Sequence, residues 1–257
     1  MCSFLLIPTV IDLQNGQRAF GKLTTNNFNI NFNIFDIISR TYIASTNYDN
    51  ILSSTMINLY SGLIIYPLVI FYFLNSNIKR KEKLADGIVL LFFIASVMVP
   101  HLNLIWHGFN FPYGFNYRFS FIFSFFLIFI ACKSFDYLKK IPLKQYLLFY
   151  IGYVWISLIT ILLRYNYLSI KFVYISVVCI GMYLTLLYYY FRTKEARQHK
   201  LIKYLLIIMV CAELFFNFFL SIRTFNVGYQ NEFEGYMTTY QSKINQYKAN
   251  ENDFYRM

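Results

Sequence analysis

The chain has 257 residues, of which 58% are hydrophobic, 21% are aromatic and only 14% are charged. Because soluble domains carry about 25% charged residues, this composition excludes an ordinary soluble enzyme as well as disordered and collagen-like chains. It indicates an all-α, polytopic helical membrane protein. The formal net charge is +11, but the cations form short clusters between apolar runs, so nucleic acid is not an expected partner.

Residues 1–11 are mostly apolar, but the stretch is too short to cross a membrane as a helix. Eleven helical residues rise only about 16 Å, roughly half of the hydrocarbon core of a membrane. The stretch has no basic region, so it makes a poor signal peptide. We interpret residues 1–11 as a partial transmembrane segment and the chain as a piece of a longer membrane protein. The alternative is a short protein with an interfacial anchor.

Residues 12–56 follow as a segment that we expect to lie outside the cytoplasm. Asn alternates with Phe or Ile over Asn26–Phe35, which is typical of a strand. The spacing of the apolar residues from Ile34 to Tyr42 instead suits a short amphipathic helix on the membrane surface. Both interpretations stay open for this segment.

Six apolar runs come next, each about long enough to cross ~30 Å of hydrocarbon as a helix. They cover Ile57–Leu74, Gly87–Ile105, Phe119–Phe135, Tyr146–Leu163, Phe172–Phe191 and Leu201–Ile222. We therefore predict a six-helix membrane domain over residues 57–222, with a kink at Pro67 in its first helix. About six full transmembrane helices and one partial helix at the N-terminus make up the expected fold.

The cations alternate from loop to loop. Residues 79–83, 133–144 and 192–203 together hold thirteen Lys and Arg residues, whereas the short loops between them hold only Arg118, Arg164 and Lys171. Basic loops stay in the cytoplasm. The pattern therefore predicts that residues 12–56, 107–118 and 223–257 are extracytoplasmic, the last of these as a tail.

The loop from His107 to Arg118 is the densest candidate site. His107 and Arg118 bracket it at the predicted membrane surface, where the fork of a guanidinium matches the oxygens of a phosphate. The alternative is an aromatic belt that binds no ligand, since Trp, Tyr and Phe collect at lipid interfaces.

Helical spacing predicts two polar stripes that lead away from this loop. One stripe holds Ser96, Pro100, Asn103 and His107, and the other holds Asn116, Ser120 and Ser124. The stripes would line a polar cleft between two spans. Alternatively, these small polar residues join the helices to one another.

Glu213 is the only ionisable group deep inside a predicted span, and it shares a helix face with Asn217 and Ser221. Carboxylates inside a membrane are costly and often mark function. A proton relay, a partner for Arg118 or Arg164, and a structural hydrogen bond all stay open. No metal-ligand spacing is present, so we predict no metal or other cofactor, and the sequence does not support a divalent cation.

The run from Asn103 to Phe121, with its W-H-G-F…P…R-x-S-F core, resembles the signature of the YfhO-like bacterial membrane proteins. Supporting stretches occur in the right order at Asn58–Leu63, Glu213–Asn217 and Phe254–Arg256. The resemblance spans nearly the whole chain.

The resemblance implies a relative of the GT-C membrane glycosyltransferases in the bacterial plasma membrane. Such a protein moves a sugar from an undecaprenyl-phosphate carrier to a cell-envelope polymer, such as lipoteichoic acid, on the outer membrane face. The expected partners are membrane lipids, the carrier-linked sugar and the polymer acceptor. The resemblance also implies that full members are longer, with an outer domain that starts in the tail of this chain. Their catalytic carboxylate usually lies in a first outer loop ahead of this region, so no residue here inherits the catalytic role.

The residues expected to bind the lipid phosphate or the sugar are Trp106, His107, Asn110, Tyr117 and Arg118. Arg118 would stabilise the leaving phosphate, His107 and Asn110 would orient the donor, and Trp106 or Tyr117 would stack on the sugar or isoprenoid. The alternatives are a transporter or flippase for a lipid-linked or anionic solute, motivated by Glu213 and Pro67, and a non-catalytic membrane scaffold fragment.

Overall fold

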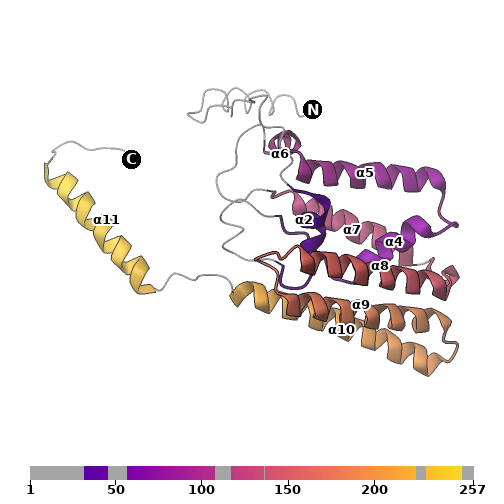
Figure 1. The fold of residues 1–257 in the computed structure, drawn as a ribbon. Coiled ribbons are helices and arrows are strands. Elements are labelled where there is room, and N and C mark those ends of the chain that lie inside the picture. Colours follow the sequence, from indigo (N-terminus) through magenta and orange to yellow (C-terminus); the bar gives the residue numbers. More distant parts are fainter. Residues whose placement is uncertain (1–31, 46–56, 108–116, 136, 224–229, 251–257) are drawn as a thin grey trace, which may run out of the picture. The chain divides into compact units, whose positions relative to one another are not determined.

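The computed structural model describes residues 32–45, 57–107, 117–135, 137–223 and 230–250 (Figure 1). Every regular element in these ranges is a helix, so the all-α prediction is confirmed for them. The predictions for residues 1–11, for most of residues 12–56 and for Asn110 lie outside the described residues. The chain divides into two units, Met1–Thr224 and Phe225–Met257, and the second contains α11 (Gln230–Asn250).

Three helices of the first unit are long and apolar enough to cross a membrane: α8 (Leu143–Leu162), α9 (Ile170–Arg192) and α10 (Ala196–Arg223). A fourth span results if α5 (Arg80–Met98) and α6 (Pro100–Trp106) count as one bent helix. The apolar helices α4 (Ile65–Leu74) and α7 (Ser120–Phe135) are shorter. The described residues therefore contain three to four candidate spans, and the predicted six full helices are not reached.

The predicted span Ile57–Leu74 is helical only from Ile65 onward. Before that point, side chains bond to nearby backbone and offer it an alternative to the helix. The side chain of Asn58 accepts a hydrogen bond from the Tyr60 N–H (3.2 Å), and Gly62 has a φ of +94°. Pro67 lies in the first turn of α4, where its missing N–H has no intrahelical role, so it does not kink a span there.

The predicted span Gly87–Ile105 is broken at Val99, where α5 and α6 meet at 103°. The residue before a proline is driven to extended backbone, and Val99, which precedes Pro100, has φ −100° and ψ 115°. The prediction of one polar stripe from Ser96 to His107 is therefore wrong, because Ser96 belongs to α5 and His107 follows α6.

The segment Arg40–Ser45 is packed into the bundle. The preceding helix α2 (Ile34–Ser39) begins at a capping box formed by Asn33 and Asp36, which favours the helical interpretation for these residues. Tyr42 and Ile43 are then fully buried.

Residues 42–44 of this segment each bond to a polar side chain of a different long helix. The Tyr42 hydroxyl lies 2.8 Å from the Ser157 Oγ of α8, and the Ile43 N–H donates to the Ser176 Oγ of α9 (3.2 Å). The Ala44 N–H donates to the Asn217 Oδ1 of α10 (2.8 Å). Non-helical backbone at membrane depth is tolerated where protein groups satisfy it in this way.

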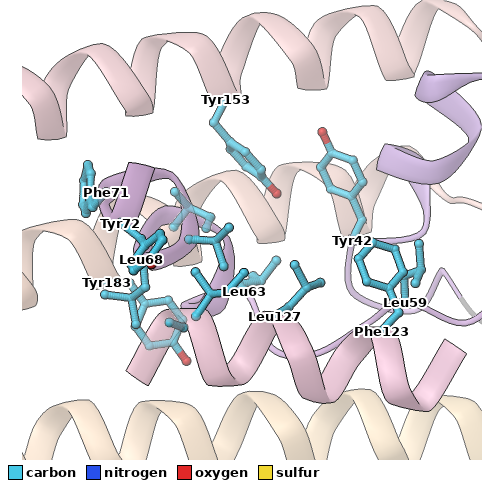
Figure 2. Close-up of a cluster of buried hydrophobic side chains, with 14 of the residues drawn as sticks. Tyr42, Leu59, Leu63, Leu68, Phe71, Tyr72, Phe123, Leu127, Tyr153 and Tyr183 are labelled. Atoms are coloured by element: carbon cyan, nitrogen blue, oxygen red, sulfur yellow. The ribbon is translucent and has the colours of Figure 1, made fainter. Parts of the chain in front are cut away.

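The core between the helices is rich in aromatic side chains (Figure 2). Phe71 of α4 is fully buried, with its ring centroid 4.7 Å from that of Tyr146 and 5.8 Å from that of Phe149. By contrast, Phe121, Phe125 and Phe215 are about two-thirds exposed. Large apolar side chains exposed on long helices suit contact with lipid rather than with water.

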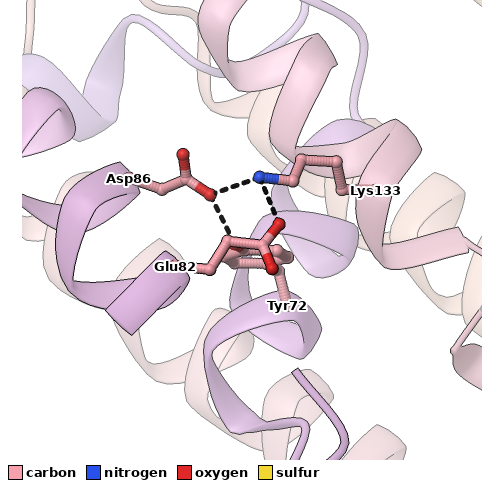
Figure 3. Close-up of polar contacts among 4 residues, drawn as sticks. All are labelled: Tyr72, Glu82, Asp86 and Lys133. Atoms are coloured by element: carbon pink, nitrogen blue, oxygen red, sulfur yellow. Dashed lines mark hydrogen bonds and ion pairs between the residues drawn. The ribbon is translucent and has the colours of Figure 1, made fainter. Parts of the chain in front are cut away.

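Two ends of the bundle can be distinguished (Figure 1). The α6 end holds α2, α6 and the α8–α9 turn, and the cation pattern predicts that it faces away from the cytoplasm. At the opposite end, Lys133 of α7 lies 2.7 Å from carboxylate oxygens of both Glu82 and Asp86 of α5, as Figure 3 shows. The Tyr72 hydroxyl of α4 donates to Asp86, so this cluster ties three helices together.

Candidate functional site

Glu213 of α10 is buried and accepts hydrogen bonds from three donors of the protein. Its Oε1 accepts from the Tyr60 hydroxyl and from the Leu63 N–H (2.7 Å), and its Oε2 accepts from the Tyr183 hydroxyl (2.5 Å). The carboxylate therefore joins α9 and α10 to the non-helical backbone ahead of α4. Of the three open interpretations, these contacts favour a structural hydrogen-bond centre.

The α6 end of the bundle is built on a stack of rings. The Trp106 ring lies 5.0 Å from the Phe119 ring at an interplanar angle of 14°, and 6.0 Å from the Phe93 ring at 18°. Trp106 ends α6, and Phe119 comes directly before α7. The stack therefore brings the neighbours of these rings, His107 and Arg118, to one corner of the bundle, which we call the Trp106 corner.

His107 is fixed in this corner by its own helix. Its Nδ1 lies 2.9 Å from the Asn103 carbonyl oxygen. Its Nε2 is buried, and so is the Asn103 Oδ1; neither atom has a hydrogen-bond partner among the residues that the structure describes. Buried polar atoms without partners are rare in proteins, so the corner offers two polar atoms to a bound molecule.

Tyr117 and Arg118 differ in exposure. Tyr117 is 4% exposed, and its ring packs edge-on against Phe32 at 5.4 Å. Its φ of 59° is a left-handed conformation that few non-glycine residues adopt. Arg118, the next residue, is exposed. Stacking of Trp106 or Tyr117 on a sugar stays a prediction, and both rings already contact rings of the protein.

A second polar cluster at the α6 end surrounds Arg40. Arg40 is 2% exposed, its guanidinium carbon lies 3.3 Å from the centroid of the Tyr167 ring, and its Nη1 donates to the Ser45 carbonyl oxygen (2.8 Å). Burial lowers the pKa of Arg40 to about 10. The nearby Asp36 accepts a hydrogen bond from the Tyr165 hydroxyl (2.8 Å). Sequence reasoning missed this cluster, although an arginine inside an apolar run was a signal for it.

Metal binding has no support in the described ranges, which contain no group of three or more His, Cys, Asp or Glu residues able to hold an ion. The functional groups that these residues do bring together are cationic, imidazole, amide and phenolic, with single carboxylates at Glu213 and Asp36. Such groups bind and orient a ligand by hydrogen bonds and charge.

The long apolar helices, with exposed aliphatic and aromatic faces, define a helical membrane protein. A family model described as bacterial membrane protein YfhO matches residues 1–257. The chain therefore belongs to the YfhO family of bacterial membrane proteins. Neither the curated proteins nor the solved structures contain a match to it.

Proposed function

We propose that this chain forms part of a glycosyltransferase that moves a sugar from an undecaprenyl-phosphate carrier to a cell-envelope polymer, such as lipoteichoic acid, on the outer membrane face. The proposal rests on one observation, which is the composition of the Trp106 corner. There the exposed Arg118 and the half-buried His107, whose Nε2 is buried, flank a stacked pair of rings at the α6 end of the bundle.

The corner suits a donor whose sugar phosphate sits at the level of the lipid headgroups. A guanidinium there balances the charge that develops on the leaving phosphate, and stabilisation of this kind is commonly the largest contribution to catalysis. The Nε2 of His107 and the Oδ1 of Asn103 are available to hydroxyl groups of the sugar. The proposal assigns no residue of the described ranges as the base for the acceptor hydroxyl.

The test uses the full-length protein in a bacterial strain that lacks its own copy. Arg118→Ala should lower the sugar content of the envelope polymer by about a hundredfold, the scale seen when one charge-stabilising donor is lost. Arg223→Ala is the control, because Arg223 is also exposed, at the end of α10 that the cation pattern places on the same side. Mass spectrometry of the polymer measures the sugar, and immunoblotting measures the protein level.

Two results would count against the proposal. If deletion of the whole protein leaves the polymer fully glycosylated, sugar transfer is not its function. If deletion abolishes glycosylation but Arg118→Ala leaves it intact at a normal protein level, Arg118 plays no part in the transfer. In that case the Trp106 corner is not the donor site.

The transporter alternative depended on Glu213 and Pro67. Because Glu213 accepts hydrogen bonds from three protein donors and Pro67 lies in the first turn of α4, neither feature favours transport over a structural role. Proton-coupled uptake into liposomes that disappears with Glu213→Gln would restore that alternative.

A further inference from the structure

The turn between α8 and α9 carries a pocket of about 720 Å³ at the α6 end of the bundle. Five polar residues line it, which are Thr160, Arg164, Tyr165, Ser169 and Lys171. Pockets that bind small molecules commonly enclose about 300–1,000 Å³. This pocket is therefore large enough for a complete lipid headgroup and larger than a bare phosphate needs.

The charge of the pocket is positive. Arg164 and Lys171 line it, and none of the carboxylates that the structure describes does. Neither cation makes an ion pair with any residue in the described part of the chain. Asp36, which contacts this turn, is already bonded to the Tyr165 hydroxyl (2.8 Å) and the Asn33 N–H (2.8 Å). The two cations are therefore available to an anion.

The pocket also has an apolar side. Leu162 and Ile170, which line it, are 78% and 50% exposed, as expected for side chains that face lipid. An occupant would thus meet cations and hydroxyl groups on one side and hydrocarbon on the other. Ser169, the N-cap residue of α9, makes no capping bond with its side chain, so its hydroxyl can also bond to an occupant.

From this combination we infer that the α8–α9 pocket binds the phosphate headgroup of an anionic membrane lipid, with Arg164 and Lys171 on the phosphate and the lipid chain along Leu162 and Ile170. A guanidinium and an ammonium group bind phosphate oxygens well. The pocket lies in a different loop from the Trp106 corner, so the inference holds whether or not the protein transfers sugars.

The experiment measures lipid binding to the purified full chain in a neutral detergent by native mass spectrometry and by thermal shift. The probes are phosphatidylglycerol, the zwitterionic phosphatidylcholine and inorganic phosphate. Phosphatidylglycerol should bind and raise the melting temperature more than phosphatidylcholine does. Arg164→Gln/Lys171→Gln should weaken phosphatidylglycerol binding by about thirtyfold, and Lys171→Gln alone by about fivefold, from the typical attraction of one cation near an anionic lipid surface.

The matched control is Arg197→Gln/Lys200→Gln, which removes the same charge from exposed residues of α10 at the opposite end of the bundle. Equal phosphatidylglycerol binding by the double variant, the control and the wild type would overturn the inference. Full protection by inorganic phosphate at the same concentration would overturn its lipid part. If the double variant does not fold, the single Lys171→Gln variant decides, since Lys171 is exposed on the first turn of α9.

Discussion

Replacing Glu213 isolates the hydrogen bonds that hold the non-helical segment 57–64 against α9 and α10. Both Glu213→Gln and Glu213→Leu remove the charge, so the energetic gain from losing a buried carboxylate is common to the two variants. Gln keeps one oxygen that can accept from Tyr60 and Leu63, as Oε1 does now. The Tyr183 hydroxyl can turn to accept from the new amide group. Leu leaves all three donors without an acceptor.

The difference between the two variants follows from those contacts. A buried donor that loses its acceptor costs about 1–3 kcal/mol, and we take the lower part of this range because two of the donors are hydroxyl groups that rotate. Glu213→Leu should therefore be less stable than Glu213→Gln by about 2–4 kcal/mol. For a chain of this size, this corresponds to a gap in melting temperature of roughly 4–16 °C.

The assay is thermal unfolding of the purified proteins in one detergent, followed by circular dichroism. Tyr183→Phe completes a double-mutant cycle: it should destabilise the wild type by about 1 kcal/mol and have almost no effect in the Glu213→Leu background. Melting temperatures for Gln and Leu within about 2 °C of each other would refute the assignment of Glu213 as a structural hydrogen-bond centre.

Three further predictions follow from the polar clusters. Lys133→Met should lower the free energy of unfolding by about 1 kcal/mol, because it removes a partly exposed pair of ion pairs and leaves Glu82 and Asp86 as a like-charged pair one turn apart. The exposed Lys139→Met is the control in the same melting assay, and equal effects would show that the ion pairs contribute nothing. Arg40→Leu should lower the melting temperature more than Arg118→Leu, since Arg40 is buried, bonded to a backbone carbonyl and stacked on a ring, whereas Arg118 is exposed. The reverse order would contradict this account of the Arg40 cluster. Burial, and then the hydrogen bond to Asp36, raise the pKa of Tyr165 above its ordinary value of 10.0. The phenol therefore ionises first in the unfolded chain, and the stability that Tyr165 contributes is lost as the pH rises above about 10. Between pH 9 and pH 11, two values on either side of that pKa, the melting temperature of Tyr165→Phe should fall less than that of the wild type, and equal falls would contradict the shift.

The long helices α8, α9 and α10 were predictable because their apolar runs are continuous and bounded by cations or by turns. The boundaries of the first two runs were not. Apolar residues occur on every side of a helix drawn through Ile57–Leu74, so no periodicity showed where the helix begins. Two side chains of the non-helical segment ahead of α4, Asn58 and Ser61, bond to backbone only two residues away. Pro100 was visible in the sequence, but the predicted span ran through it, whereas the structure bends there by 103°.

The candidate site was predictable in part. Trp106 and Phe119 are separated by the loop that was singled out, and the structure stacks them. The same sequence contained Ser157, Ser176 and Asn217, which look like ordinary packing residues of membrane helices. Their partners lie in a segment more than a hundred residues away, as the separations of 115, 133 and 173 positions show, and sequence spacing gives no information on contacts of that range.

Those separations set an order for the assembly of the protein. Residues 42–44 are synthesised well before Ser157, Ser176 and Asn217, and each of the three helices that receive them enters the membrane later. Until the last of these helices is in place, the amides of Ile43 and Ala44 need water or another temporary acceptor, because unpaired amides are costly in hydrocarbon. The burial of this short segment is therefore a late event in biogenesis, and a chain interrupted before α10 would leave the Ala44 amide without its final acceptor.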